Sequence, residues 1–123
     1  MNIGDVITRK RTFREEDIRM FGRLSSDEGV HHIQTDEEGR LMAQGLLTAT
    51  LPTKIGGNLN FIAREMTFQF LRPVYATDTI ECQVTITDLH EDRGLVNVSS
   101  KWTCVNQRGK EVMNGRATGS IRR

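Results

Sequence analysis

Long apolar runs are missing from this sequence, and so is any large excess of one charge. No stretch of 18 consecutive apolar residues exists, and the N-terminal segment MNIGDVITRK has no apolar core of the kind a secretion signal carries. We therefore expect a cytoplasmic protein with no membrane partner. Lys and Arg number 17 against 16 Asp and Glu, so the formal net charge of +1 provides no overall field that would attract nucleic acid.

Cysteine and proline are also scarce, with two of each in 123 residues. Cys82 and Cys104 lack a CxxC spacing and lie in strand-like segments, which favours two reduced, buried thiols over a disulfide or a zinc site. Pro52 and Pro73 lie inside patterned segments, and no repeat or linker divides the chain. The length suits one hydrophobic core, so we expect a single domain over residues 1–123.

Two segments in the first half of the chain have a helical pattern. Thr12 and Glu15 have the spacing of a capping box, and the first helix should end near Ser25. The side chains expected on its buried face are Ile18, Phe21 and Leu24. The second segment, residues 44–55, is largely apolar on all sides and stops at Gly56-Gly57, which predicts a buried helix. Pro52 removes one backbone hydrogen bond there and is expected to kink or end the helix.

From residue 64 onward the apolar residues alternate with polar ones, as in half-buried antiparallel strands. The alternating sets are Met66, Phe68 and Phe70; Ile80, Cys82, Val84 and Ile86; and Val96, Val98, Trp102 and Cys104. Turn residues separate them at 76–78, 91–94, where His90 is expected to be part of the turn, and 106–109. With a short strand near residues 6–11 and a last strand near 111–121, the pattern predicts an α+β fold in which a bent antiparallel sheet wraps around one central buried helix.

The segment SSDEGVHH, residues 25–32, places two histidines close to two carboxylates. A metal site, a catalytic acid/base pair and a solvated loop are all compatible with these residue types. Adjacent histidines rarely bind one ion together and no HExxH pattern is present, so we expect no metal. His31 would point away from His32 in an extended loop and lie on the surface or in a dimer contact.

Four stretches of this sequence together resemble the MaoC-like hotdog proteins, which include the (R)-specific enoyl-CoA hydratases and related 3-hydroxyacyl dehydratases. They are FGRLSSDEGVHH, QGLLTATL, FLRPVYATDTIECQVTITDL and NQRGKEVMNGRATG. In that family an SGDxNPxH loop precedes an HG pair that opens the central helix, and RPVxxGDT opens a later strand. Asp27 and His32 match the Asp and His of the loop. Gly29, Val30 and Gln44 replace its Asn, its Pro and the His of the HG pair.

The resemblance implies a hydratase or dehydratase that acts on enoyl or 3-hydroxyacyl thioesters of coenzyme A or acyl carrier protein, without a cofactor. Asp27 and His32 would be the catalytic acid and base, since an imidazole titrates near pH 6.5, at about cytosolic pH. The amide of Gly45, at a helix start, would bind the thioester oxygen, and Thr50 and Gln44 are expected beside the substrate. The family also implies a homodimer or a higher homo-oligomer.

Two other functions remain compatible with the same residues. A non-catalytic acyl-thioester-binding subunit, or the partner of a second hotdog chain, would tolerate Gly29 and Gln44. An acyl-CoA thioesterase would use a carboxylate as base or nucleophile. Release of a free thiol would identify thioester hydrolysis, and loss of the enoyl double bond would identify hydration.

Overall fold

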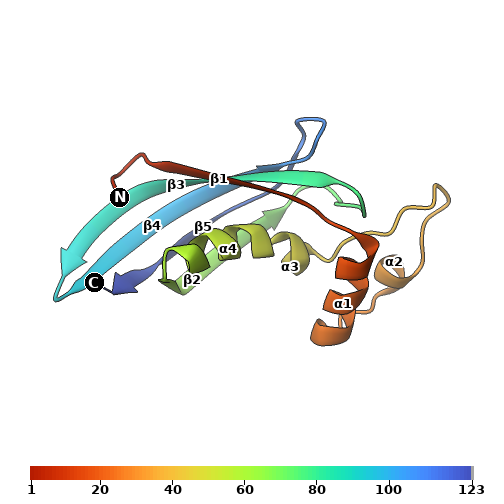
Figure 1. Cartoon of the computed structure of the whole chain (residues 1–123), viewed down its shortest axis with the longest axis horizontal. Helices are drawn as coiled ribbons and strands as arrows, with labels where there is room; N and C mark the ends of the chain where they lie inside the picture. Colours follow the sequence, from red (N-terminus) through yellow and green to blue (C-terminus); the bar gives the residue numbers. More distant parts are fainter. Residues whose placement is uncertain (123) are drawn as a thin grey trace.

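Five antiparallel strands form one curved sheet in the computed structural model, which describes residues 1–122. The order of the strands across the sheet is β1-β3-β4-β5-β2, and every neighbouring pair is antiparallel. The sheet curves around a helix that lies against its concave face (Figure 1). The elements in chain order are β1 (Val6–Thr12), α1 (Glu15–Ser25), α2 (Val30–Ile33), α3 (Gly45–Thr48), α4 (Thr50–Asn58), β2 (Phe61–Phe70), β3 (Thr79–Asp92), β4 (Leu95–Val105) and β5 (Glu111–Arg122).

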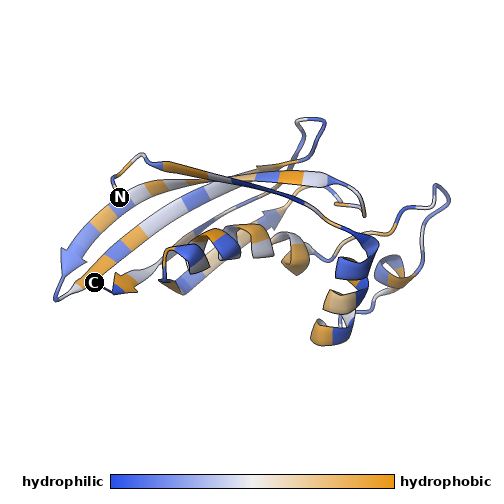
Figure 2. Cartoon of the chain, viewed as in Figure 1, coloured by the Kyte–Doolittle hydropathy of each residue, from blue (hydrophilic) through white to orange (hydrophobic). Residues whose placement is uncertain are grey.

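The alternation of apolar residues places most of the predicted side chains of β3 and β4 in the core, whereas Val96 is half-buried and Phe70 of β2 is 54% exposed. Ile80, Cys82, Val84 and Ile86 of β3 are all buried, and so are Val98, Trp102 and Cys104 of β4. The register sets Cys82 opposite Cys104 and Val84 opposite Trp102, so the two buried rows lie on the same face of the sheet. Orange and blue residues accordingly alternate along the strands (Figure 2). The predicted bent sheet around a buried helix is confirmed.

The central helix is interrupted near Pro52, as expected, but it differs from its prediction in where it ends and in how much of it is buried. It is interrupted between Thr48 and Thr50, one turn before Pro52, because the proline ring crowds the carbonyl four residues earlier and offers it no N–H. It also continues to Asn58, past the expected end at Gly56-Gly57. The helix buries one side against the sheet through Leu47, Leu51 and Ile55, whereas Leu46 is 59% exposed, so it is not covered all round.

Helix α1 begins two residues later than predicted. Its N-cap is Arg14, whose backbone N–H donates to the carboxylate of Asp17 at 3.0 Å. The Thr12 hydroxyl instead bonds the hydroxyl of Thr79 across strands β1 and β3. Ile18 is fully buried as expected, but Leu24 is 82% exposed, because α1 extends beyond the end of the sheet and packs against α2.

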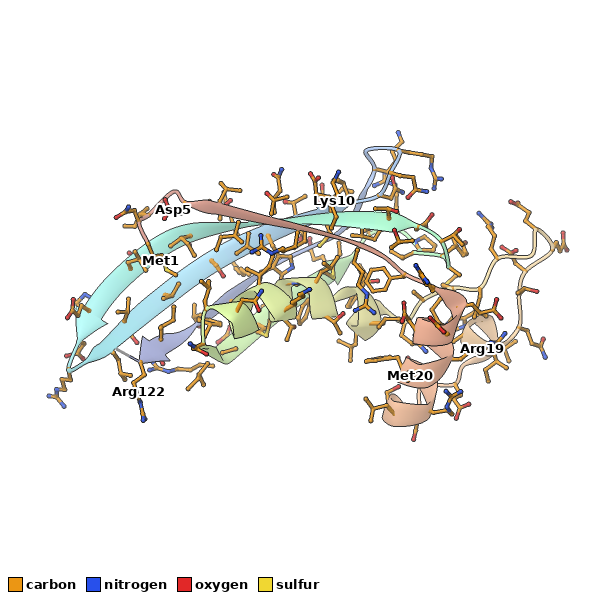
Figure 3. The ribbon with its side chains drawn as sticks, viewed as in Figure 1. Met1, Asp5, Lys10, Arg19, Met20 and Arg122 are labelled. Atoms are coloured by element: carbon orange, nitrogen blue, oxygen red, sulfur yellow. The ribbon has the colours of Figure 1, made fainter. Side chains whose placement is uncertain are left out.

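Both termini lie at the end of the sheet opposite α1. Met1 and Arg122 are at that end, while Arg19 and Met20 mark α1 at the other (Figure 3). The predicted turns lie between the strands, except that His90 is within β3, opposite Asn97 of β4. No helix among residues 1–122 is long and apolar enough to cross a membrane.

Candidate active site

The segment after α1 brings Asp27 and His32 together. The helix ends at Ser26 in a left-handed conformation with φ of 61°, and the Ser25 hydroxyl accepts the N–H of Asp27 at 3.0 Å. The chain then makes one helical turn, α2, instead of the extended loop expected. As a result, Oδ2 of Asp27 lies 3.7 Å from Nε2 of His32. This distance is longer than a hydrogen bond, and both residues line the same cavity.

The orientation of His32 makes Nε2 its basic atom. Nδ1 lies 2.7 Å from the carbonyl oxygen of Met42. Because a carbonyl can only accept a hydrogen bond, this contact assigns the proton of the neutral ring to Nδ1 and leaves the lone pair on Nε2, toward Asp27. The ring of His32 is buried, whereas the Asp27 side chain is 54% exposed. A buried base therefore stands beside a carboxylate that solvent and substrate can reach.

The Asp27–His32 pair lines a cavity of about 500 Å³. The opposite walls are the start of α3 at Gly45 and Thr48, the segment 70–74, and Val112 and Met113 of β5. The N–H groups of Gly45 and Leu46 open the helix, where backbone donors have no partner within the helix itself. The cavity therefore contains backbone N–H donors that could bind a substrate oxygen, together with the Asp27–His32 pair.

Gly45 permits the close approach of an aromatic ring. A Cβ at this position would lie 2.8 Å from Cε1 of Phe70, closer than atoms normally approach. The ring of Phe70 is itself part of the cavity wall. The glycine at the helix start is therefore needed for the shape of the cavity.

Thr50 lies elsewhere than expected. Its hydroxyl donates to the backbone carbonyl of Leu47, and the residue is not part of the cavity lining. The threonine that lines the cavity is Thr48, which is 3% exposed. The sequence did contain a signal for it, since a residue three positions after Gly45 lies on the same side of a helix.

Gln44 also lies away from the cavity. Its side chain is 1% exposed, and Nε2 donates to the carbonyl of Ile18 at 2.9 Å. The same nitrogen lies 3.5 Å from the backbone carbonyl of Asp27. Gln44 therefore does not contact the substrate space, because its amide is directed toward the backbone of α1.

His31 is nearer to the pair than expected. Its ring centroid lies 3.9 Å from that of His32, at an interplanar angle of 62°, and it is exposed at the cavity. The prediction that it points away is wrong, because residues 30–33 are helical and not extended. Arg72 is a further cavity residue that the sequence prediction missed, and its guanidinium donates to the carbonyl of Glu111 at 2.6 Å.

A second, apolar cavity of about 170 Å³ lies between α4 and the sheet. Ile55, Met66, Trp102 and Ala117 are among the residues that line it. Among residues 1–122, no group of three or more His, Cys, Asp or Glu side chains is arranged to hold a metal ion. The two thiols of Cys82 and Cys104 are free and buried in the core.

The chain has a curved antiparallel sheet around a helix, with an Asp–His pair that faces the start of that helix. These are the features of the hotdog hydratases and dehydratases, so this is the class with which the chain is compared. A family model described as the FAS1-like dehydratase domain region matches residues 30–115. The match covers more than half of the sequence, so the chain belongs to this MaoC-like dehydratase family.

Relatives and solved structures agree with this assignment. An (R)-specific enoyl-CoA hydratase of Rhodospirillum rubrum is 29% identical, covering 94% of this chain and 84% of that protein. The solved (R)-hydratase from A. caviae, involved in PHA biosynthesis, has a TM-score of 0.83 at 22% identity, covering 98% of this chain and 97% of that one. The HadBC (3R-hydroxyacyl-ACP dehydratase) complex of Mycobacterium tuberculosis has a TM-score of 0.72 at 20% identity, covering 96% of each chain. The predicted hotdog fold is thereby confirmed.

Proposed function

We propose that this protein hydrates enoyl thioesters of coenzyme A or acyl carrier protein, or catalyses the reverse dehydration. The observation that carries the proposal is the placement of His32 Nε2 and Asp27 Oδ2 in the same cavity as the start of α3 at Gly45. Addition of water to a conjugated thioester needs a base, an acid and a donor for the thioester oxygen, and these are the three kinds of group present.

The proton transfers follow from the tautomer of His32. In the hydration direction the water oxygen bonds to C3 of the enoyl group while Nε2 of His32 takes one of its protons. The N–H of Gly45 stabilises the enolate-like thioester oxygen that forms. The protonated ring then delivers the same proton to C2, so that H and OH are both added. Asp27 orients the water and stabilises the imidazolium ion.

Two further features support a thioester substrate. Arg72 places a cation at the cavity wall, which suits the phosphate groups that both coenzyme A and the acyl-carrier arm contain. The second cavity has an apolar lining, which suits a hydrocarbon chain.

An assay of the wild-type protein distinguishes hydration from thioester hydrolysis and from binding without reaction. With crotonyl-CoA, we expect loss of the enoyl absorbance and formation of 3-hydroxybutyryl-CoA, with no release of free coenzyme A. Release of the free thiol with the double bond intact would instead identify a thioesterase. Binding of crotonyl-CoA without either reaction would identify a non-catalytic subunit.

The exposed sheet edge favours assembly with another chain. Strand β2 is an edge strand, and Ile62, Phe70 and Leu71 in or next to it are 63%, 54% and 46% exposed. An apolar edge strand is normally covered. We propose that a second copy covers it in a homodimer. Sedimentation should show a dimer for the wild type and a monomer for Ile62→Lys.

A partner subunit is the second candidate, favoured by the replacements Gly29, Val30 and Gln44 relative to the family loop and helix start. In that case, the chain alone would sediment as a monomer and its hydration of crotonyl-CoA would appear only when a second hotdog chain is added.

A further inference from the structure

Gln44 lies where three parts of the chain meet behind the Asp27–His32 pair. It precedes α3, its side chain is buried under α1, and its Nε2 donates to the carbonyl of Ile18 while lying 3.5 Å from that of Asp27. A Cβ added to Gly22 of α1 would lie 3.3 Å from this Nε2 and 3.4 Å from the Asp27 carbonyl oxygen. The peptide of Asp27 therefore lies directly against α1, and a side chain at position 22 would push on the contact between Gln44 and Asp27.

The amide of Gln44 is poorly explained by stability alone. Its Oε1 is buried and has no hydrogen-bond partner among residues 1–122. An unpartnered buried acceptor is unfavourable, and an apolar side chain of similar size would avoid that penalty. Polar groups that a fold keeps in spite of such a penalty are expected at functional sites.

Few contacts fix the position of Asp27. Its side chain is 54% exposed, and it belongs to an irregular segment between two helices. Besides the Gln44 contact, its backbone is held by the bond from its N–H to the hydroxyl of Ser25. A displacement of the carboxylate by about 1 Å can cost an enzyme roughly a hundredfold in rate.

We propose that Gln44 is a positioning residue for Asp27: its buried side-chain amide ties the Asp27 peptide to α1, and Gly22 leaves the room that this contact requires. The effect on catalysis rests on the proposed function, whereas the effect on the position of Asp27 does not. Gln44 itself touches neither the cavity nor the substrate space.

The first experiment compares Gln44→Met with Gln107→Met. Both variants replace an amide by an apolar chain of similar length, but Gln107 bonds Asp78 in a turn remote from the pair. We expect Gln44→Met to lower kcat for crotonyl-CoA hydration at least tenfold with KM within twofold, and Gln107→Met to leave both unchanged. In an Asp27→Asn background, Gln44→Met should lower kcat less than twofold, because Gln44 acts through that carboxylate. An equal loss in both backgrounds would overturn the proposal.

The second experiment does not depend on catalysis. The amide order parameter of Asp27, measured by NMR relaxation, should be about 0.85 in the wild type and fall below about 0.6 in Gln44→Met. In Gln107→Met it should stay at the wild-type value. An unchanged order parameter in Gln44→Met would refute the anchoring, even if the protein proved to have a different activity.

A third comparison uses glycine. Gly22→Ala adds a methyl group beside the Gln44 amide, whereas Met20→Ala shortens a side chain of the same helix that is 61% exposed. We expect Gly22→Ala to lower kcat at least fivefold while its thermal unfolding midpoint is maintained or raised, and Met20→Ala to leave kcat unchanged. A kcat of wild-type size in Gly22→Ala would contradict the role given to this glycine.

Discussion

Gly45→Ala should leave the fold intact but impair catalysis, because the added methyl group displaces the ring of Phe70. The added Cβ would lie 2.8 Å from Cε1 of Phe70, so the ring has to retreat about 0.7 Å to reach an ordinary contact of about 3.5 Å. Phe70 is the last residue of β2, so its ring can turn about the Cα–Cβ bond without breaking the pairing of the strands. Alanine is also favoured over glycine in a helix by up to about 1 kcal/mol. The free energy of unfolding should therefore stay within about 1 kcal/mol of the wild type.

The consequence for activity is larger. The ring of Phe70 belongs to the cavity wall beside the Gly45 amide, so its retreat moves the place where a thioester carbonyl would lie. A misplacement of this size predicts a loss of roughly tenfold to a hundredfold in kcat. The assay is hydration of crotonyl-CoA, with chemical denaturation measured on the same samples.

The variant Phe70→Ala supplies the control. Added to Gly45→Ala, it removes the ring that the new methyl group displaces, and kcat should recover to within about threefold of that of Phe70→Ala alone. If the double variant stays as slow as Gly45→Ala, the methyl group itself obstructs the substrate and the reasoning from Phe70 is refuted.

Three further predictions concern stability and the thiols. Gly115→Ala should destabilise the fold by about 3 kcal/mol in urea unfolding, because its Cβ would lie 2.6 Å from the indole ring of Trp102 and closer still to the carbonyl oxygen of Thr67. Thr77→Gly should stabilise the protein by about 1 kcal/mol, because Thr77 has φ of 76°, where a branched side chain is strained; an unchanged unfolding midpoint would contradict this. A hydrogen bond with Cys82, and burial, raise the pKa of the Cys104 thiol. Since the unfolded thiol loses its proton first, the free energy of unfolding should fall with a slope approaching about 1.4 kcal/mol per pH unit above pH about 9, and Cys104→Ala should reduce that slope.

The strands could be predicted because alternation with a period of two depends only on which face is buried. Ile80 to Ile86 are buried in the expected rows, and the turn at 106–109 lies where expected, whereas β3 continues to Asp92 and leaves only residues 93–94 between the strands. The predicted start of α1 was wrong because the Thr12 hydroxyl bonds that of Thr79 on the neighbouring strand, 67 residues away in the sequence. A capping pattern carries no information about such a distant competitor.

The candidate site was predictable in part. The spacing of Asp27 and His32 was visible, but their convergence depends on the left-handed Ser26 and on a four-residue helical turn too short to have a periodic pattern. The place of Gln44 could not be predicted, because it depends on the packing of α1, whose Ile18 lies 26 residues away in the sequence. Thr50 was preferred over Thr48 on family resemblance, although helical geometry from Gly45 favours Thr48.

The central claim is that Asp27 and His32 form the proton-transfer pair. The most direct measurement is the rate of crotonyl-CoA hydration by Asp27→Asn and by His32→Ala, with circular dichroism to verify that both are folded. We expect each variant to lose at least a hundredfold in kcat, because His32 carries the proton, a role that typically contributes 10²–10⁴-fold, and Asp27 orients the water and stabilises the imidazolium ion. Retention of wild-type activity by both folded variants would contradict it.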